Sequence, residues 1–297
     1  MTTIESYNTD HIIGLKIGTS TILNELARGG MAIVFIAYQR TLKRRIAVKI
    51  LPKAFLTSKT AELFQQEAEA AAILSHPNII PIYEVGETKE FLFFTMQLIQ
   101  GVPLTKLFKI AQKQVLPSKR LLPLKQTIQF IAQILDALQY AHQQDIIHRD
   151  IKPDNILIEK HSQRPIIMDF GVAKVLREED EDHSMIRGTP LYMAPEQIIG
   201  ETKGGRTDIY AIGSVLFQML VPELPLPKFD SADAMLKYKL LNKNGFFKKK
   251  PSELNPFLSK EMDKIVGRAI TYKPENRYTD CQEFKSKLEW YRQTYLR

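Results

Sequence analysis

The chain has 297 residues, of which 44% are apolar and 25% are charged, a composition ordinary for a soluble globular protein with one large core or two modest ones. The formal net charge is +8, but the lysines are scattered over the whole chain. The obvious basic run, 248–250, is a pattern more often found in a solvated loop than in a binding site. We therefore expect no nucleic acid as a partner.

The first hundred residues predict a small α+β unit. Residues 20–50 show the apolar alternation of successive β-strands, interrupted by turns rich in glycine or basic residues. Helical spacing over 61–74 predicts one helix, which ends before Pro77 because a proline disfavours helix in the residue that precedes it. Two further strands are predicted over 79–85 and 91–99, separated by a polar turn.

Long helical segments follow Gly101. The clearest is 125–142, where apolar residues lie on one stripe. The basic, proline-containing segment 112–124 is expected to be a surface connection. With a hinge expected near 99–101, the chain divides into an N-terminal tail (1–19), a smaller lobe (20–98) and a mostly helical larger lobe (99–297), which together make one domain.

Two short strings carry the chemistry. Residues 148–155 read His-Arg-Asp-Ile-Lys-Pro-Asp-Asn, and fourteen residues after Asn155 the chain reads Asp169-Phe170-Gly171. These strings resemble the catalytic loop and the metal-binding D-F-G turn of the protein kinases. The resemblance implies that Asp150 accepts or orients the proton of the substrate hydroxyl and that Lys152 stabilises the transferring phosphoryl group. It also implies that Asn155 and Asp169 hold Mg²⁺.

The same resemblance implies a packing role, and no catalytic one, for two neighbours of these residues. His148 and Phe170 are expected to hold the two loops in register.

The resemblance extends upstream to a nucleotide site. Residues 26–34 resemble the kinase glycine-rich loop, with Ala27 and Ala32 in place of the first and third glycines. Residues 46–49 resemble the strand whose lysine contacts the α and β phosphates and pairs with a glutamate on the next helix, for which family spacing favours Glu67 over Glu69. The nucleotide-binding residues implied are Leu26, Ala27, Gly29, Gly30, Val34, Ala47, Lys49, Glu67, Met96, Gln97, Leu98 and Leu157.

In this resemblance the adenine would lie between apolar side chains. Val34 and Ala47 would line one wall and Leu157 the other, with Met96 at the back, because a flat aromatic base suits an apolar crevice. Residues 97–99 would offer backbone groups to the edge of the base.

Downstream, residues 188–196 resemble the end of the kinase activation segment, which would form a platform for an extended peptide. Residues 208–213 resemble the helix start behind the catalytic loop. Glu196 would form a buried ion pair with Arg277 that organises the helical lobe. Lys152 together with Thr189 matches the pattern of the serine/threonine kinases and differs from that of the tyrosine kinases. The similarity spans residues 23–288.

The resemblance also implies a control point at Arg149, which in similar kinases receives a phosphate from the activation loop. Here that loop carries an acidic run over 178–182. Either this run or phosphorylated Ser184 would supply the negative charge. An acidic loop that makes no such contact is an equally open alternative.

The overall pattern, chiefly Gly29-Gly30-Met31 and Met193-Ala194-Pro195-Glu196-Gln197, most resembles the bacterial relatives of the eukaryotic serine/threonine kinases. It implies an α+β fold of two lobes, the smaller with an antiparallel sheet and one helix and the larger mainly helical. The implied activity is ATP- and Mg²⁺-dependent phosphorylation of Ser/Thr hydroxyls in protein substrates, with autophosphorylation. A pseudokinase that binds nucleotide without turnover would have to rest on Ala27 and Ala32. Lys152 and the segment 188–196 argue against a small-molecule phosphotransferase.

We expect a cytoplasmic location. The single cysteine, Cys281, suits a reducing compartment and is expected to be an ordinary helical residue. No apolar stretch approaches the roughly 18 residues of a membrane span, and residues 1–10 lack the features of a secretory signal. Many bacterial relatives carry a membrane span and a sensor domain after the kinase, so this chain is also consistent with a piece of a longer receptor. Substrate, activating signal and oligomeric state do not follow from the sequence.

Overall fold

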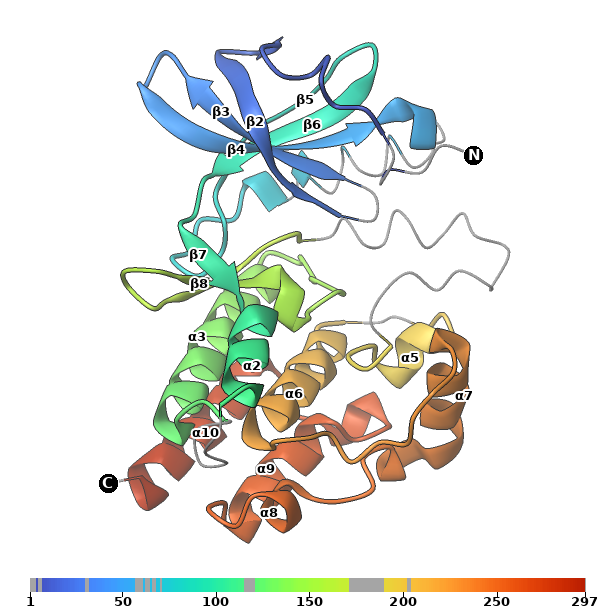
Figure 1. Ribbon diagram of the computed structural model, residues 1–297. Coiled ribbons are helices and arrows are strands. Elements are labelled where there is room, and N and C mark those ends of the chain that lie inside the picture. The colour runs from blue at the N-terminus through green and yellow to red at the C-terminus, as the bar shows by residue number, and fades with distance from the viewer. Residues whose placement is uncertain are drawn as a thin grey trace. The chain divides into compact units, whose positions relative to one another are not determined.

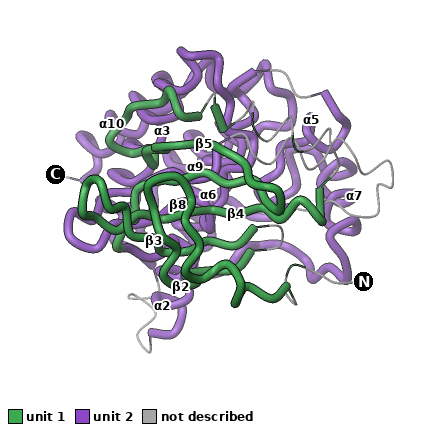
Figure 2. The backbone as a smooth tube through the Cα atoms, turned by 90° about the horizontal axis from the view of Figure 1, so that it is seen from above, with its two compact units in different colours: residues 1–100 green, residues 101–297 purple. Residues whose placement is uncertain are grey.

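The computed structural model describes most of the chain in ten stretches: residues 4, 7–29, 32–56, 61, 65, 68–69, 71–114, 121–170, 190–201 and 204–296. The chain forms two compact units, residues 1–100 and 101–297, which Figures 1 and 2 show. The division falls within the hinge region expected near 99–101. Each unit is described below by itself.

Unit 1 is built on a six-stranded antiparallel sheet with the strand order β1-β2-β3-β4-β6-β5. The strands are β1 (Lys16–Ile17), β2 (Ser20–Arg28), β3 (Ile33–Gln39), β4 (Arg44–Pro52), β5 (Ile82–Glu87) and β6 (Phe91–Gln97). The strands predicted within 20–50 are therefore confirmed. Strand β5 begins at Ile82 and not at Ile79, because Pro81 has no N–H to donate to a ladder.

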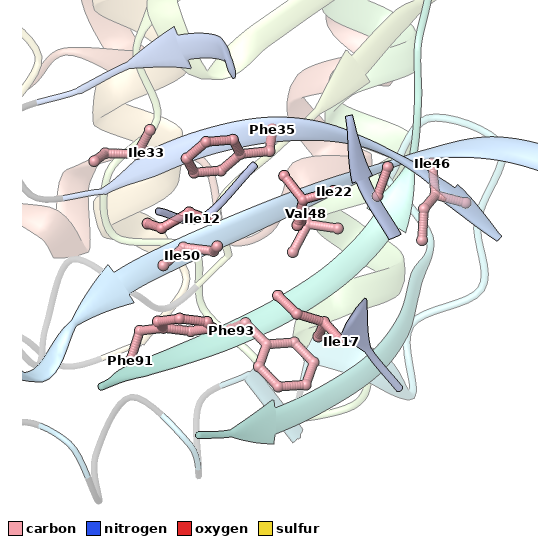
Figure 3. Packing of buried hydrophobic residues seen from close by; sticks show 11 residues of the cluster. Ile12, Ile17, Ile22, Ile33, Phe35, Ile46, Val48, Ile50, Phe91 and Phe93 are labelled. Atoms are coloured by element: carbon pink, nitrogen blue, oxygen red, sulfur yellow. The ribbon is translucent and has the colours of Figure 1, made fainter. Parts of the chain in front are cut away.

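One face of this sheet carries the core of unit 1. Side chains alternate along each strand, so Ile33 and Phe35 of β3 share a face with Val48 and Ile50 of β4, and all four are fully buried. Figure 3 shows these side chains gathered with Phe91 and Phe93 of β6 and with isoleucines from the start of the chain. The β-branched and aromatic composition of the strands suits this half-buried pleated surface.

The described residues at the start of the chain contribute to this core, whereas the sequence predicted a tail over 1–19. Ile12 and Ile17 are 0% and 2% exposed within the cluster, and β1 pairs with β2. Arg28 at the end of β2 fastens the same segment, since its Nη1 donates to the carbonyl oxygens of Ile4 and Tyr7 at 2.8 and 2.7 Å. The segment shows no strand period, so its attachment was not predictable from spacing.

Unit 1 also contains the predicted helical segment. Its described residues between 61 and 72 are helical, and the chain leaves the helix before Pro77, as expected. Ala68 and Ala71 are buried. The short 3-10 helix η2 (Lys53–Phe55) follows β4.

Unit 2 combines a small sheet with a helical body (Figure 1). The sheet has the antiparallel order β7-β8-β9, with β7 (Gly101–Pro103), β8 (Ile156–Glu159) and β9 (Pro165–Ile167). The helices are α2 (Leu104–Gln112), α3 (Leu124–His142), α5 (Pro195–Ile198), α6 (Arg206–Leu220), α7 (Ala232–Asn242), α8 (Pro251–Leu254), α9 (Lys260–Ala269) and α10 (Cys281–Tyr295). Short 3-10 helices are η4 (Pro153–Asn155), η5 (Lys243–Gly245) and η6 (Pro274–Asn276).

Helix α6 is the centre of unit 2. It is apolar on nearly all sides and buried on nearly all sides, as expected for a helix enclosed by others, and α3 and α9 pack against it. A Cβ at Gly213 would lie 2.7 Å from the Cβ of Ala269, so glycine permits the close approach of α6 and α9. The apolar stripe predicted over 125–142 is fully buried in α3.

Cys281 is the first residue of α10 and is completely buried, which confirms its expected place in a helix. Burial raises the pKa of its thiol well above the usual value, so the group behaves as a small apolar side chain. Among the described residues, no helix has both the length and the apolar composition needed to cross a lipid bilayer.

Phe35→Ala tests whether the cluster on the sheet determines the stability of unit 1. The substitution removes a fully buried ring and should lower the free energy of unfolding by about 3–5 kcal/mol. Leu42→Ala is the control, because Leu42 is 61% exposed and its truncation should change that free energy by no more than about 0.5 kcal/mol. Urea denaturation followed by circular dichroism measures both. Equal losses in the two variants would contradict this assignment of the core.

Candidate active site

The catalytic loop of unit 2 is held by one buried carboxylate. Asp208, in the first turn of α6, accepts the backbone N–H of His148 at 2.9 Å and that of Arg149 at 2.8 Å. It also accepts the Nε2–H of His142 at 2.8 Å. Arg149, the second of these backbone donors, has a left-handed backbone conformation with φ 65°. Such a conformation persists in a non-glycine residue only where its surroundings determine it.

The charge of Asp208 is stabilised by these donors. Burial alone would raise the pKa of its carboxyl, but the hydrogen bond and charge of His142 and the backbone N–H of His148 hold that pKa below its usual value. The stability that this carboxylate contributes is therefore present above its usual pKa and is lost as the pH falls through the lowered value.

His148 joins the catalytic loop to the D-F-G turn, as expected. Its Nε2 donates to the carbonyl oxygen of Met168 at 2.8 Å, and its Nδ1 accepts the N–H of Asp150 at 3.2 Å. The ring packs against Phe170 with 4.6 Å between centroids. Because one ring nitrogen donates and the other accepts, these contacts select the neutral tautomer with its proton on Nε2.

Three of the predicted catalytic side chains meet at Asp150. The Nζ of Lys152 lies 2.7 Å from its carboxylate Oδ2. The amide nitrogen of Asn155 donates to the same Oδ2 at 3.1 Å and to the backbone oxygen of Asp150 at 2.9 Å. Both side chains of the ion pair are about one-fifth exposed, so the carboxylate is oriented by its neighbours and still reachable.

The fourth predicted side chain, Asp169, follows the hairpin of β8 and β9. The N–H of Met168 donates to the carbonyl oxygen of Asn155 at 2.9 Å, which ties the D-F-G turn to the loop. Asp169 also has a left-handed backbone, with φ 59°.

The donor set of Asn155 and Asp169 fits Mg²⁺. The amide nitrogen of Asn155 is used by Asp150, so the amide oxygen of this buried side chain is the atom available to a cation. Asp169 adds a carboxylate. Magnesium prefers oxygen ligands and is commonly held by one or two such side chains together with phosphate oxygens.

Five of the predicted nucleotide residues of unit 1 share one face of the sheet. The register pairs Ala27 with Val34, Val34 with Lys49, and Ala47 with Met96. Directly paired residues and residues two apart point to the same side of a sheet, so these five side chains lie on the face opposite the Phe35 cluster. Strand register thus places an ammonium group beside small and apolar side chains.

The remaining predicted nucleotide residues have varied positions. Gly29 donates its N–H to Ala32 and closes the turn between β2 and β3, whereas Leu26 lies at a bulge in β2 and is half exposed. The N–H of Gln97 at the end of β6 donates to Pro81, and Leu98 follows it. Leu157 lies in β8 of unit 2, paired with Pro103 and Ile166. Gly30, Glu67, Ser184 and Thr189 lie outside the described residues.

The expected ion pair between Glu196 and Arg277 is present in unit 2. The guanidinium contacts both carboxylate oxygens, at 2.6 and 2.7 Å, and both side chains are buried. Arg277 also donates to three backbone carbonyl oxygens, those of Thr271, Arg206 and Tyr272. The pair therefore fastens α5, the start of α6 and the segment before η6 to one another.

A sequence comparison decides the family. The model of the protein kinase domain matches residues 20–289. The chain belongs to the protein kinase domain family. Serine/threonine-protein kinase Pkn1 of Myxococcus xanthus is 32% identical over 287 residues, and PrkC of Bacillus subtilis is 31% identical over 281 residues. Each alignment covers 94% of this chain but only 39% and 41% of the respective relative, so the chain spans about two fifths of their length.

Solved structures agree with this membership. The kinase domain of Mycobacterium tuberculosis PknI superposes with a TM-score of 0.73 at 25% sequence identity, covering 94% of this chain and 97% of that one. The resemblance read from the motifs is thereby confirmed, together with the α+β kinase fold.

Gln197, a residue of the motif at 193–197, makes two contacts for which the motif assigned it no role. Gln197 in α5 accepts the N–H of Ala194 at 2.9 Å and donates to the carbonyl oxygen of Arg149 at 2.8 Å. A glutamine at the third position of a helix is the known signal for the first contact. Nothing in the local sequence indicates the second, which joins α5 to the catalytic loop.

Arg277→Ala should destabilise the kinase domain strongly, because it leaves the Glu196 charge buried without its partner. We expect a loss of about 3–5 kcal/mol in the free energy of unfolding, measured by urea denaturation. Arg268→Ala is the matched control, since the pair of Arg268 with Glu283 is partly exposed to water, which screens it. A loss for Arg277→Ala no larger than that of the control would be evidence against the role of the buried pair.

Proposed function

We propose that this chain is a serine/threonine protein kinase that uses ATP and Mg²⁺ to phosphorylate protein substrates and that also phosphorylates itself. The observation that carries the proposal is the convergence of Lys152 and Asn155 on the carboxylate of Asp150, in a chain of the protein kinase family. The relatives named as serine/threonine-protein kinases support the choice of hydroxyl acceptor.

In the proposed reaction the substrate hydroxyl is oriented by Asp150. As the hydroxyl oxygen forms its bond to the γ-phosphorus, the bond from that phosphorus to the leaving ADP oxygen breaks and the hydroxyl proton passes to the Asp150 carboxylate. Lys152, held 2.7 Å from this carboxylate, offers its ammonium to the phosphoryl oxygens, where negative charge is spread in the transition state. Positioning of this kind needs no covalent intermediate.

The proposed nucleotide-binding residues come from each of the two units. Lys49 of unit 1 supplies an ammonium for the α and β phosphates, and Val34, Ala47 and Met96 on the same sheet face supply apolar contacts. Leu157 of unit 2 supplies another. Asn155 and Asp169 would hold Mg²⁺, which when bound neutralises charge on the phosphates.

A pseudokinase is the alternative, and its case rests on Ala27 and Ala32. Ala27 pairs with Val34 next to the bulge in β2, and the carbonyl oxygen of Ala32 accepts the N–H of Gly29 at 2.9 Å, so both alanines are accommodated where β2 and β3 meet. The polar groups required for transfer are all present. We therefore favour an active kinase over a pseudokinase.

A cytoplasmic location is also part of the proposal, because the single cysteine of the chain is free.

Asp150→Asn should distinguish an active kinase from a pseudokinase that only binds nucleotide. Loss of the general base should lower the rate of phosphate transfer by about 100- to 10,000-fold while nucleotide binding persists. Asp154→Asn is the matched control, because Asp154 lies in the same loop and is exposed. Transfer of labelled γ-phosphate to myelin basic protein, followed by phosphoamino-acid analysis, measures the outcome. Phosphotyrosine as the sole product, or equal activity in the two variants, would reject the proposal.

We also propose that Arg149 receives negative charge from the acidic run 178–182 or from phosphorylated Ser184, residues that lie outside the described part of the chain. Either Ser184→Ala or neutralisation of the run to Asn and Gln should lower the transfer rate about tenfold, the effect of losing one charge-assisted hydrogen bond. Ser286→Ala, at an exposed position of α10, is the control. Unchanged turnover in both test variants would remove this regulatory role.

A further inference from the structure

A lysine occupies a core position in unit 2 that neither the motifs nor the proposed chemistry uses. Lys239 lies in α7, three residues after the buried Leu236, where helical spacing calls for an apolar side chain. Its side chain is 0% exposed. Its Nζ donates to the carbonyl oxygens of Pro190 and Leu191 at 2.8 Å and of Met193 at 2.7 Å.

The three carbonyls match the three N–H donors of an ammonium group. Burial lowers the pKa of Lys239 well below its usual value, and the charge of Arg277 acts in the same direction. The carbonyl dipoles oppose this effect. The rings of Phe246 and Tyr210 add cation–π contacts, with centroids 4.5 and 5.0 Å from the Nζ. An apolar side chain would avoid the cost of burying a charge here, so the ammonium is best explained by what it holds.

The carbonyl groups that Lys239 holds belong to an irregular segment that precedes α5. Residues 190–193 form turns and belong to no helix or strand, so their carbonyls cannot be satisfied by a regular ladder. The segment continues directly into α5, which packs against α7 (Figure 1). From α5, Gln197 donates to the carbonyl oxygen of Arg149, the residue before Asp150. Lys239 and Gln197 thus secure the two ends of one stretch of chain.

A second contact fixes the same segment from α6. The hydroxyl of Tyr192 donates to the Oε1 of Gln218 at 2.5 Å. Leu191, Tyr192 and Met193 are all buried, at 6–7% exposure. The segment therefore has a defined backbone conformation whose groups face α6 and α7.

We propose that Lys239 is a positioning residue for protein substrates: it holds the backbone of Pro190–Met193 in the shape that receives the polypeptide around the acceptor serine or threonine. This inference rests on the proposed kinase activity. It assigns Lys239 to the binding of the polypeptide and not to ATP or to the transfer step, since its hydrogen bonds go to the segment and none of its contacts is with the catalytic set.

The test compares Lys239→Met with Lys237→Met, the same substitution at an exposed position of the same helix. Methionine keeps the length of the side chain and packs beside Phe246 and Tyr210, but it cannot donate to the carbonyls. For Lys239→Met we expect the KM for myelin basic protein to rise about tenfold, as the loss of a charge-assisted hydrogen bond predicts, while the KM for ATP changes less than about twofold. Lys237→Met should behave as the wild type in both.

Hydrogen–deuterium exchange gives a readout that does not depend on activity. In Lys239→Met the amides of 191–194 should exchange about tenfold faster, with α3 and α6 unchanged. If the wild type transfers no phosphate to any protein, the proposed function fails, but the exchange comparison still tests the role of Lys239. If Lys239→Met does not fold, the same measurements are made on Lys239→Gln, which keeps two N–H donors.

Three outcomes would overturn the inference. Unchanged exchange at 191–194 in the folded variant would show that the ammonium does not hold the segment. An unchanged KM for the protein substrate would show that the segment does not depend on it for binding. Unfolding of both Lys239 variants with Lys237→Met intact would assign the residue to the stability of the whole unit instead.

Discussion

The loop of unit 2 that carries the proposed catalytic residues depends on one buried carboxylate. Asp208 accepts two successive backbone N–H groups, those of His148 and Arg149, and the second donor, Arg149, has a left-handed backbone. A non-glycine residue in this conformation costs about 1–3 kcal/mol, which charge-assisted hydrogen bonds to a buried carboxylate can offset. Asp150 follows immediately, so the direction of the proposed base is set by a residue 58 positions later in the chain. The strained backbone of Arg149 and the orientation of the proposed base Asp150 therefore depend on the same buried carboxylate.

Unit 2 uses buried cations where its chain is irregular. Helices and strands satisfy their own carbonyl groups, but the segments before α5 and before η6 cannot, and Lys239 and Arg277 donate to five of these carbonyls in total. Each cation is expensive to bury and is compensated only while all of its partners are in place. Removing one partner therefore leaves the free-energy cost of burying the charge uncompensated. Long-range polar contacts therefore act together with the burial of Leu191, Tyr192 and Met193 to fix the segment before α5.

In unit 1 the two faces of the sheet have different roles: one face packs the core, and the other carries the proposed nucleotide-binding side chains. Ile33, Phe35, Val48 and Ile50 face the core, and the residues between them, Val34 and Lys49, face the opposite side. The side chains of a strand alternate with a period of two, so a slip of one residue between β3 and β4 would exchange these roles. The buried cluster makes such a slip costly, and in this way apolar packing fixes the direction of a charged side chain.

The sequence by itself determined the chemical groups and the regular elements. Asp150, Lys152, Asn155 and Asp169 follow from residue types at a family spacing, and β2–β4 and α3 follow from periods that depend only on local backbone geometry. The tertiary structure alone decided that Ile12 and Ile17 join the first core, that Gln197 meets Arg149, and that Lys239 meets three carbonyls almost fifty residues away. The physical reason is that a backbone carbonyl is the same in every residue. A sequence can mark a donor in an unusual place, as it does at Lys239, but only folding selects the acceptors it will meet.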